Sequence, residues 1–259
     1  MLLTIKQTIE QHSFLFTELV KRDFKRKYKK TVLGIFWSML NPLLQLLVMV
    51  MVFTHFFGAN TPHFFVYVFA GQKVFAYFTE GTTGGMMAIQ GNADILSKVN
   101  APKYLFLLAN NVSAMINFLF TLVIFFILIA VEGIPFHPRF LMFVYPILTL
   151  MVFNVGVGMV LSALYVFFKD TSYLYGIVSM TLMWLSAIFY PIHTFSPLVQ
   201  QLFLLNPVFA HIHYFRLIVL YQQTPSINVH LVLLLYSSVS LLIGTLFYKR
   251  FNKTFSYYM

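Results

Sequence analysis

A dense cluster of positive charge lies directly before a membrane-length apolar segment, and this junction constrains the fold more than any other part of the sequence. Residues 21–30 carry seven lysines and arginines, and the stretch from Thr31 to Phe57 is mostly apolar. About 20 apolar residues suffice to cross a bilayer as a helix. Basic residues flanking such a helix stay in the cytoplasm, so the junction predicts a membrane protein with a cytoplasmic N-terminus. The basic cluster consists of Lys21, Arg22, Lys25, Arg26, Lys27, Lys29 and Lys30.

The segment 1–30 is predicted to be an amphipathic helix on the inner face of the membrane. Its apolar residues recur at mostly helical spacing, which is typical of an interfacial helix. The basic cluster would then contact anionic lipid, at about 1 kcal/mol per basic residue. Packing against a partner protein is the alternative. We expect no nucleic-acid binding, because bilayer-spanning helices follow the cluster.

The composition indicates that lipid surrounds most of the chain. Of its 259 residues, 59% are hydrophobic and 9% are charged, whereas soluble domains carry about 25% charged residues. The absence of cysteine excludes disulfides and thiolate metal sites. We predict an all-α integral membrane protein in which the interface helix precedes a single transmembrane domain, residues 31–259.

Six transmembrane helices are predicted in this domain. They cover approximately residues 33–57, 64–88, 104–131, 141–168, 173–191 and 229–248. The segment 192–228 is too rich in proline for a plain span and too apolar for a free loop, so we expect two short re-entrant helices there. Fourteen of the 17 lysines and arginines fall on the predicted cytoplasmic side, while Arg139 and Arg216 fall outside and Lys73 lies within a span. This bias predicts that both termini are cytoplasmic.

The sequence lacks the motifs of an ATP-hydrolysing or metal-dependent enzyme. It contains no GxxxxGK[ST] phosphate-binding loop and no HExxH pair, and it has only seven acidic residues. We therefore expect neither catalytic activity, nor a metal, nor any cofactor on this chain.

Four stretches together resemble the transmembrane subunit of an ABC-2 type exporter of polysaccharide or teichoic acid. They are residues 31–37 (TVLGIFW) with Asn41-Pro42, residues 96–102 (LSKVNAP), residues 167–170 (FFKD) leading to Tyr190-Pro191-Ile192, and Asn206-Pro207 followed by Arg216. The chain departs from the family pattern at Lys169, where arginine is usual, and at Ala101, where phenylalanine is usual.

This resemblance implies a homodimer of the chain in the bacterial cytoplasmic (inner) membrane, with two copies of a separate nucleotide-binding ABC ATPase. ATP and Mg²⁺ would bind to that partner. The substrate would be a glycan on a polyprenyl-diphosphate lipid, of O-antigen, capsule or teichoic acid type. The cytosolic segments would contact the ATPase, and the residues implied in this coupling are Asp94, Leu96, Lys98, Pro102, Lys103, Lys169 and Asp170.

A charged stripe within the second predicted span is the candidate transport path. Lys73, Tyr77, Glu80 and Gly84 share one helical face. Charges within a span cost about 2.5–3.5 kcal/mol on insertion scales and usually face a cavity or a partner. The stripe therefore either meets the glycan or forms a structural ion pair, within the bundle or across a dimer seam.

Aromatic side chains suit a sliding glycan, although lipid-facing positions explain most of them. Those predicted for the path, because they lie near the stripe or the motifs, are Phe75, Phe78, Tyr165, Phe168, Trp184 and Tyr190. The glycines at positions 81, 84, 85, 156 and 158 are expected to allow close helix packing.

Two other functions remain open from the sequence. A polytopic membrane enzyme acting on lipid-linked sugars would need an acidic cluster on one face, and none is evident. An ABC-2 exporter of lipids or drugs would differ from the glycan exporter only in its substrate.

Overall fold

The computed structural model describes residues 2–29, 31–52, 62–98, 101–251 and 255, and these ranges contain helices and no strand. The α-helices are α1 (Leu2–Tyr28), α2 (Trp37–Val52), α3 (Phe64–Met87), α4 (Ala93–Leu96), α5 (Tyr104–Val131), α6 (Val144–Phe167), α7 (Thr171–Leu185), α8 (Pro197–Phe203), α9 (Pro207–Val219) and α10 (Ile227–Phe251). Short 3₁₀ helices span Gly34–Phe36, Gln90–Asn92, Pro138–Phe143 and Ile192–Thr194.

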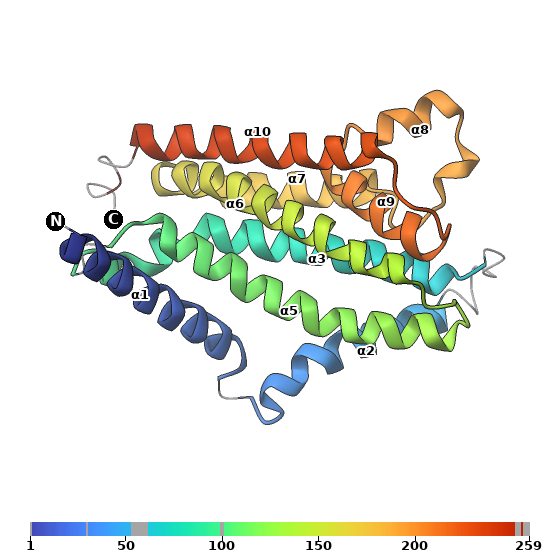
Figure 1. Ribbon diagram of the computed structural model, residues 1–259, viewed down its shortest axis with the longest axis horizontal. Coiled ribbons are helices and arrows are strands. Elements are labelled where there is room, and N and C mark those ends of the chain that lie inside the picture. The colour runs from blue at the N-terminus through green and yellow to red at the C-terminus, as the bar shows by residue number, and fades with distance from the viewer. Residues whose placement is uncertain (1, 30, 53–61, 99–100, 252–254, 256–259) are drawn as a thin grey trace.

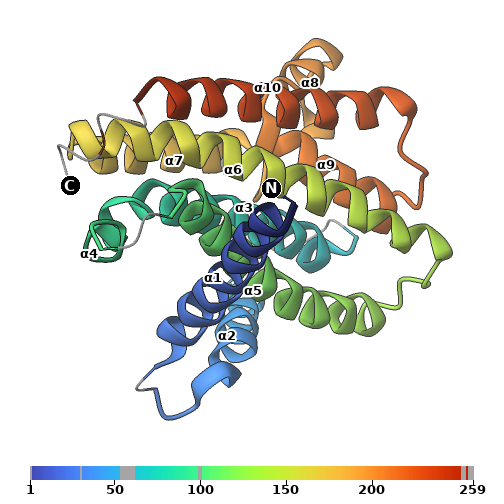
Figure 2. The same cartoon turned by 60° about the vertical axis from the view of Figure 1, so that its left-hand side comes forward.

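The long helices run side by side, with α3 in the middle of the bundle (Figure 1). α3 packs against α5, α6 and α9, and α10 packs along α6. α1 crosses the bundle obliquely and contacts α5 (Figure 2). The start of α1 and the end of α10 lie at one end of the bundle, and α8 lies at the other (Figure 1). We call the former the basic end; it carries Lys98, Lys103, Lys169, Lys249 and Arg250.

Among the described residues, three helical segments are long and apolar enough to cross a membrane: Tyr104–Val131, Pro138–Phe167 and Ile227–Phe251. The pair α8 and α9 also qualifies if it is counted as one broken span, bent by 108°. α2 is shorter, with 16 residues, and the predicted end of its span at residue 57 lies outside the described residues. Neither α3 nor α7 is both long and apolar enough to qualify as a span. Length and composition therefore support some of the six predicted spans and not all of them.

The segment 192–228 contains two short helices, as predicted. Pro197 and Pro207 occupy the first turns of α8 and α9, where proline fits because the first backbone N–H groups have no partner within the helix. Asn206 caps α9, because its side-chain oxygen accepts hydrogen bonds from the backbone N–H groups of Val208 (2.9 Å) and Phe209 (3.3 Å). Most of α9 is buried against the bundle.

Arg216, predicted to fall on the outer side of the membrane, is buried in the bundle and only 2% exposed. Its guanidinium donates to the backbone carbonyls of Tyr67 (3.1 Å), Ala187 (2.9 Å) and Ile188 (3.2 Å). α7 ends at Leu185 rather than 191, because the chain turns at Ala187 (φ +46°) and presents these carbonyls to Arg216.

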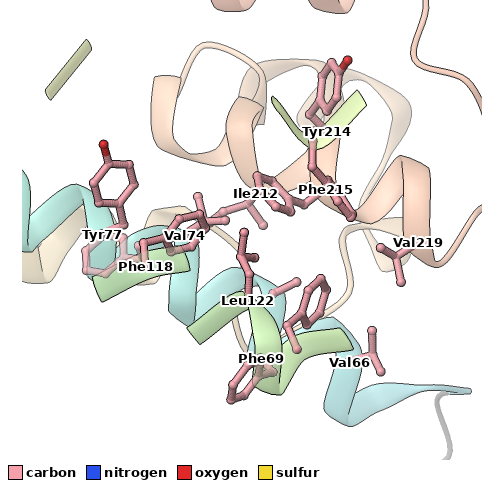
Figure 3. Close-up of a cluster of buried hydrophobic side chains, with 14 of the residues drawn as sticks. Val66, Phe69, Val74, Tyr77, Phe118, Leu122, Ile212, Tyr214, Phe215 and Val219 are labelled. Carbon is pink, nitrogen blue, oxygen red and sulfur yellow. The ribbon is translucent and has the colours of Figure 1, made fainter. Parts of the chain in front are cut away.

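A continuous apolar core joins α3, α5 and α9. Side chains from the three helices meet in Figure 3, among them Phe69 and Val74 of α3. The rings of Tyr77 and Phe118 stack at 5.0 Å, and those of Phe143 and Phe215 stack at 4.7 Å. A second apolar cluster fills the basic end between α1, α5, α6 and α10.

Glycines allow the closest helix contacts, which confirms their predicted packing role. A Cβ on Gly85 of α3 would lie 3.0 Å from the Cα of Gly158 of α6. A Cβ on Gly156 would lie 2.3 Å from the backbone of Ser240 in α10, and one on Gly244 would lie 2.5 Å from the carbonyl oxygen of Gly156. Backbones this close leave no room for a larger residue.

Candidate functional site

A polar cavity of about 530 Å³ lies between α1, α2, α3 and α5. Its volume is within the range of ligand-binding pockets, roughly 300–1,000 Å³. Its polar and aromatic lining consists of Lys27, Tyr28, Thr31, Trp37, Ser38, Asn41, Gln45, Lys73, Tyr77, Glu80, Asn117, Phe118 and Thr121. Four helices from the first half of the chain contribute to it, so the site depends on how they pack together.

Lys73 lies at the buried part of the cavity. It is 7% exposed, and its ammonium donates to the side-chain oxygen of Gln45 at 2.7 Å. The ammonium also lies 4.9 Å from the centroid of the Phe69 ring, within the range of a cation–π contact. Neither of these two partners carries a negative charge. The cavity therefore holds a buried cation that an anionic or strongly polar ligand would stabilise.

Glu80 anchors a network of hydrogen bonds at the more exposed part of the cavity. Its Oε1 accepts from the Lys27 ammonium at 2.9 Å and from the Asn117 amide at 2.7 Å. The Tyr28 hydroxyl donates to the Asn117 side-chain oxygen at 2.7 Å. The side chains of Lys27 and Glu80 are 46% and 38% exposed. Two consecutive residues of α1 thus hold this helix over α3 and α5.

The lining is suited to binding and lacks the arrangement of a catalytic site. Amide and hydroxyl groups can exchange hydrogen bonds with sugar hydroxyls, and aromatic rings such as Trp37 and Phe118 offer apolar faces. Among the described residues, no three His, Cys, Asp or Glu side chains are placed to hold a metal ion. The lining contains one carboxylate, Glu80, which is already paired with Lys27.

Three of the predicted path residues, Lys73, Tyr77 and Glu80, meet in this cavity. The shared helical face inferred from their spacing is therefore confirmed, whereas their role in transport remains a prediction. Within the chain, Lys73 and Glu80 do not pair with each other, since Lys73 contacts Gln45 and Glu80 contacts Lys27. A pair across a dimer seam stays a prediction.

The six other aromatic residues predicted for the path do not line this cavity. Phe75 and Phe78 are buried, and their rings lie 5.9 Å apart in the apolar core. Tyr165 lies beneath the Lys169 ammonium, 4.5 Å from ring centroid to nitrogen. Phe168 and Trp184 are exposed, and Tyr190 donates a hydrogen bond to the backbone carbonyl of Trp184. Their proximity in sequence to the stripe or the motifs did not bring them into the cavity.

The predicted coupling residues gather at the basic end. Asp94 and Lys98 are exposed, while Leu96 packs against the second apolar cluster. Lys169 and Asp170 are exposed in the turn between α6 and α7, and Pro102 and Lys103 are partly buried before α5. This placement leaves charged groups available to a partner, and the coupling role remains a prediction.

The basic cluster divides into two groups. Lys25, Arg26 and Lys29 are exposed, Lys21 pairs with Glu18 (2.9 Å), and Arg22 pairs with Asp23 (2.6 Å). Lys27 instead reaches the cavity, which its place in a charge run did not reveal. Lys30 lies outside the described residues.

Other lining residues were also missed, although the sequence carried a signal for some of them. Asn117 and Thr121 are polar residues four apart in a mostly apolar span, and Asn41 and Gln45 have the same spacing in α2. Polar residues within a span usually face the interior of a bundle, so the spacing indicates a polar face. The spacing does not indicate which other helix each polar face contacts.

Comparison with known proteins identifies similar membrane transport components. The family model described as ABC-2 type transporter matches residues 15–220. An O-antigen export system permease protein RfbA from Myxococcus xanthus is 27% identical over 197 residues, which cover 74% of this chain and 74% of that protein. A protein of the same name from Klebsiella pneumoniae is 25% identical over 158 residues, which cover 60% of this chain and 61% of that protein.

Proposed function

Because the chain belongs to the ABC-2 type transporter family, we propose that it is the transmembrane subunit of an ATP-driven exporter of polysaccharide. The family makes it a multi-pass membrane transport protein and not an enzyme. The proposed substrate is a glycan linked to a polyprenyl diphosphate and moved across the cytoplasmic membrane. The O-antigen export role in the names of the relatives supports this substrate class.

The observation that carries the proposal is the polar cavity within a bundle of this family. Its hydroxyl, amide and aromatic groups suit sugar units, and Lys73 offers a positive charge to a phosphate group. We infer that Lys73, Tyr77 and Glu80 contact the lipid-linked glycan on its way through. The predicted aromatic residues that lie outside the cavity would contact the glycan only in another part of the transport path.

The proposed assembly contains two copies of this chain and two copies of a separate ABC ATPase that binds ATP and Mg²⁺. The lack of a phosphate-binding loop in this sequence supports a separate ATPase. The exposed charges of Asp94, Lys98, Lys169 and Asp170 support coupling through the basic end.

We further propose six spans, with α1 at the inner membrane surface and both termini in the cytoplasm. The gathering of positive charge at the basic end supports this orientation. The chain has no cysteine, so the labelling of single introduced cysteines can reveal the orientation of the chain in the membrane. A cysteine at Lys98 should react with an impermeant reagent only after the membrane is opened, and one at Leu198 should react in intact cells. Labelling of position 98 in intact cells would overturn the orientation.

Removal of the chain from its host tests the function. We expect loss of the surface glycan, with lipid-linked glycan accumulating inside, and recovery when the wild-type gene is returned. The same loss is expected when the ATP-binding lysine of the partner ATPase is replaced. Normal surface glycan in the absence of the chain would exclude this substrate class and favour export of another lipid.

A further inference from the structure

A second crevice, separate from the cavity described above, lies at the basic end between the start of α5 and the end of α10. Its volume is about 330 Å³, and its lining includes Lys103, Tyr104, Thr245, Tyr248 and Lys249. Two lysines from distant parts of the chain thus share one crevice. Among the described residues that line it there is no carboxylate.

The groups around this crevice favour a negatively charged ligand. Burial lowers the pKa of the Lys103 ammonium, because desolvation disfavours its charged form and an anion would restore it. Tyr248 lines the crevice and is 7% exposed. α5, 28 residues long, begins at Tyr104 without a side-chain cap. The dipole of this helix adds a partial positive charge on the same side.

The surroundings of the crevice favour a lipid over a soluble anion. Leu242, Ile243 and Leu246 on α10 are 62%, 44% and 58% exposed. Leu242 precedes Thr245 by three residues, and Leu246 precedes Lys249 by three, so these pairs are neighbours on the helix surface. A headgroup between the lysines would therefore place its hydrocarbon chains along exposed apolar side chains, which a free phosphate cannot use.

We propose that this crevice binds the phosphate-bearing headgroup of an anionic membrane phospholipid, with the acyl chains lying along α10. Lys103 and Lys249 contact the phosphate from α5 and α10. The site includes Pro102 and Lys103, which belong to the predicted coupling residues, so the lipid would link the membrane to the region proposed for coupling. The binding itself does not depend on which substrate is exported.

Native mass spectrometry of the purified full-length protein, titrated with phosphatidylglycerol or phosphatidylcholine, tests the site. We expect phosphatidylglycerol to bind more tightly. Lys103→Gln/Lys249→Gln should weaken that binding by tenfold or more, at about fivefold per basic residue. The matched control Lys98→Gln/Arg250→Gln removes two charges from the same end, outside the crevice, and should bind as the wild type does.

Several outcomes would overturn the proposal. Equal losses in the two double variants would indicate diffuse surface charge, and equal binding of the two lipids would exclude headgroup recognition. Displacement of phosphatidylglycerol by inorganic phosphate at comparable concentration would assign the site to a soluble anion. Lys249 is exposed, so Lys249→Gln alone is a second variant with little risk to folding, and it should weaken binding by about fivefold.

Discussion

Lys27 of α1 and Glu80 of α3 form an ion pair with 2.9 Å between Nζ and Oε1, although 53 residues separate them in the sequence. Asn117 of α5 donates to the same carboxylate oxygen, and Tyr28 donates to Asn117. The network fixes the end of α1 across the cavity. Glu80 is therefore the residue that connects α1 and α5 to α3 at this side of the cavity.

Glu80→Gln should lower export while leaving the protein folded. The pair with Lys27 is partly exposed, so its loss should reduce the free energy of unfolding by no more than about 1 kcal/mol. Thermal unfolding in detergent and the amount of surface glycan measure the two effects. Lys21→Gln, which breaks the exposed pair with Glu18 within α1, is the control and should change neither. Full export by Glu80→Gln would remove Glu80 from the path.

Lys73→Met should also lower export while membrane insertion and dimer assembly persist. If Lys73 is only structural, the single change should impair folding, because it leaves the Gln45 amide oxygen without its partner at 2.7 Å. Replacing both residues, as Lys73→Met/Gln45→Leu, should then restore the protein. Expression, assembly and export are measured for both single variants and the double. Recovery of export in the double variant would reject a role in the path.

Arg216→Met should destabilise the protein by about 3–5 kcal/mol or more. The change leaves the carbonyls of Tyr67, Ala187 and Ile188 without their donor in a buried site. Arg216→Lys should not restore stability, because an ammonium cannot reproduce the planar set of donors or stack on Tyr67 as the guanidinium does at 3.4 Å. Thermal unfolding in detergent measures both, with the exposed Arg250→Met as control. A stable Arg216→Lys variant would contradict the geometric argument.

Gly156→Ala should destabilise the bundle, whereas Gly176→Ala should not. A methyl group on Gly156 would meet the Ser240 backbone at 2.3 Å, so α6 and α10 must separate, at a cost of about 1–3 kcal/mol. Nothing lies within 4 Å of a Cβ on Gly176 in α7, and alanine favours a helix by roughly 1 kcal/mol. The difference in unfolding temperature between the two variants is the measurement. Equal temperatures would show that the α6–α10 contact relaxes freely.

Lys98→Glu and Asp170→Ala should reduce the ATPase activity of the assembled transporter by about tenfold while both proteins still insert. Both residues are exposed at the basic end, so neither change should affect the core. Arg139→Glu, at the opposite end of the bundle, makes the same charge reversal as Lys98→Glu and should leave activity unchanged. Normal ATPase activity and export in both variants would refute the assignment of these residues to coupling.

The sequence predicted correctly the ends of those helices that neighbouring residues determine. The span expected at 104–131 is found at Tyr104–Val131, because a mostly apolar run without charged residues lies between Lys103 and Glu132. The span expected at 173–191 ends early, at Leu185. Its turn at Ala187 is stabilised by Arg216, 29 residues later, and hydrophobic periodicity carries no information about such a partner.

The candidate site was predictable only one helix at a time. The spacing of Lys73, Tyr77 and Glu80 placed them on one face of α3, and the structure confirms that they share a cavity. Their partners come from other helices: Lys27 from α1 and Gln45 from α2. Lys27 is one of seven basic residues in its segment, and charge alone does not distinguish the residue that reaches Glu80.

The glycine contacts restrict how this protein can move. Gly85 and Gly158 fasten α3 to α6, and Gly156 and Gly244 fasten α6 to α10, with backbone contacts that leave no slack for sliding. We therefore expect α3, α6 and α10 to behave as one rigid unit. α1 and α2 form the opposite wall of the cavity, and side-chain contacts hold them there: the Lys27–Glu80 pair, the Lys73–Gln45 hydrogen bond and the apolar packing of Leu19. We therefore expect α1 and α2, rather than α3, α6 and α10, to move during a transport cycle.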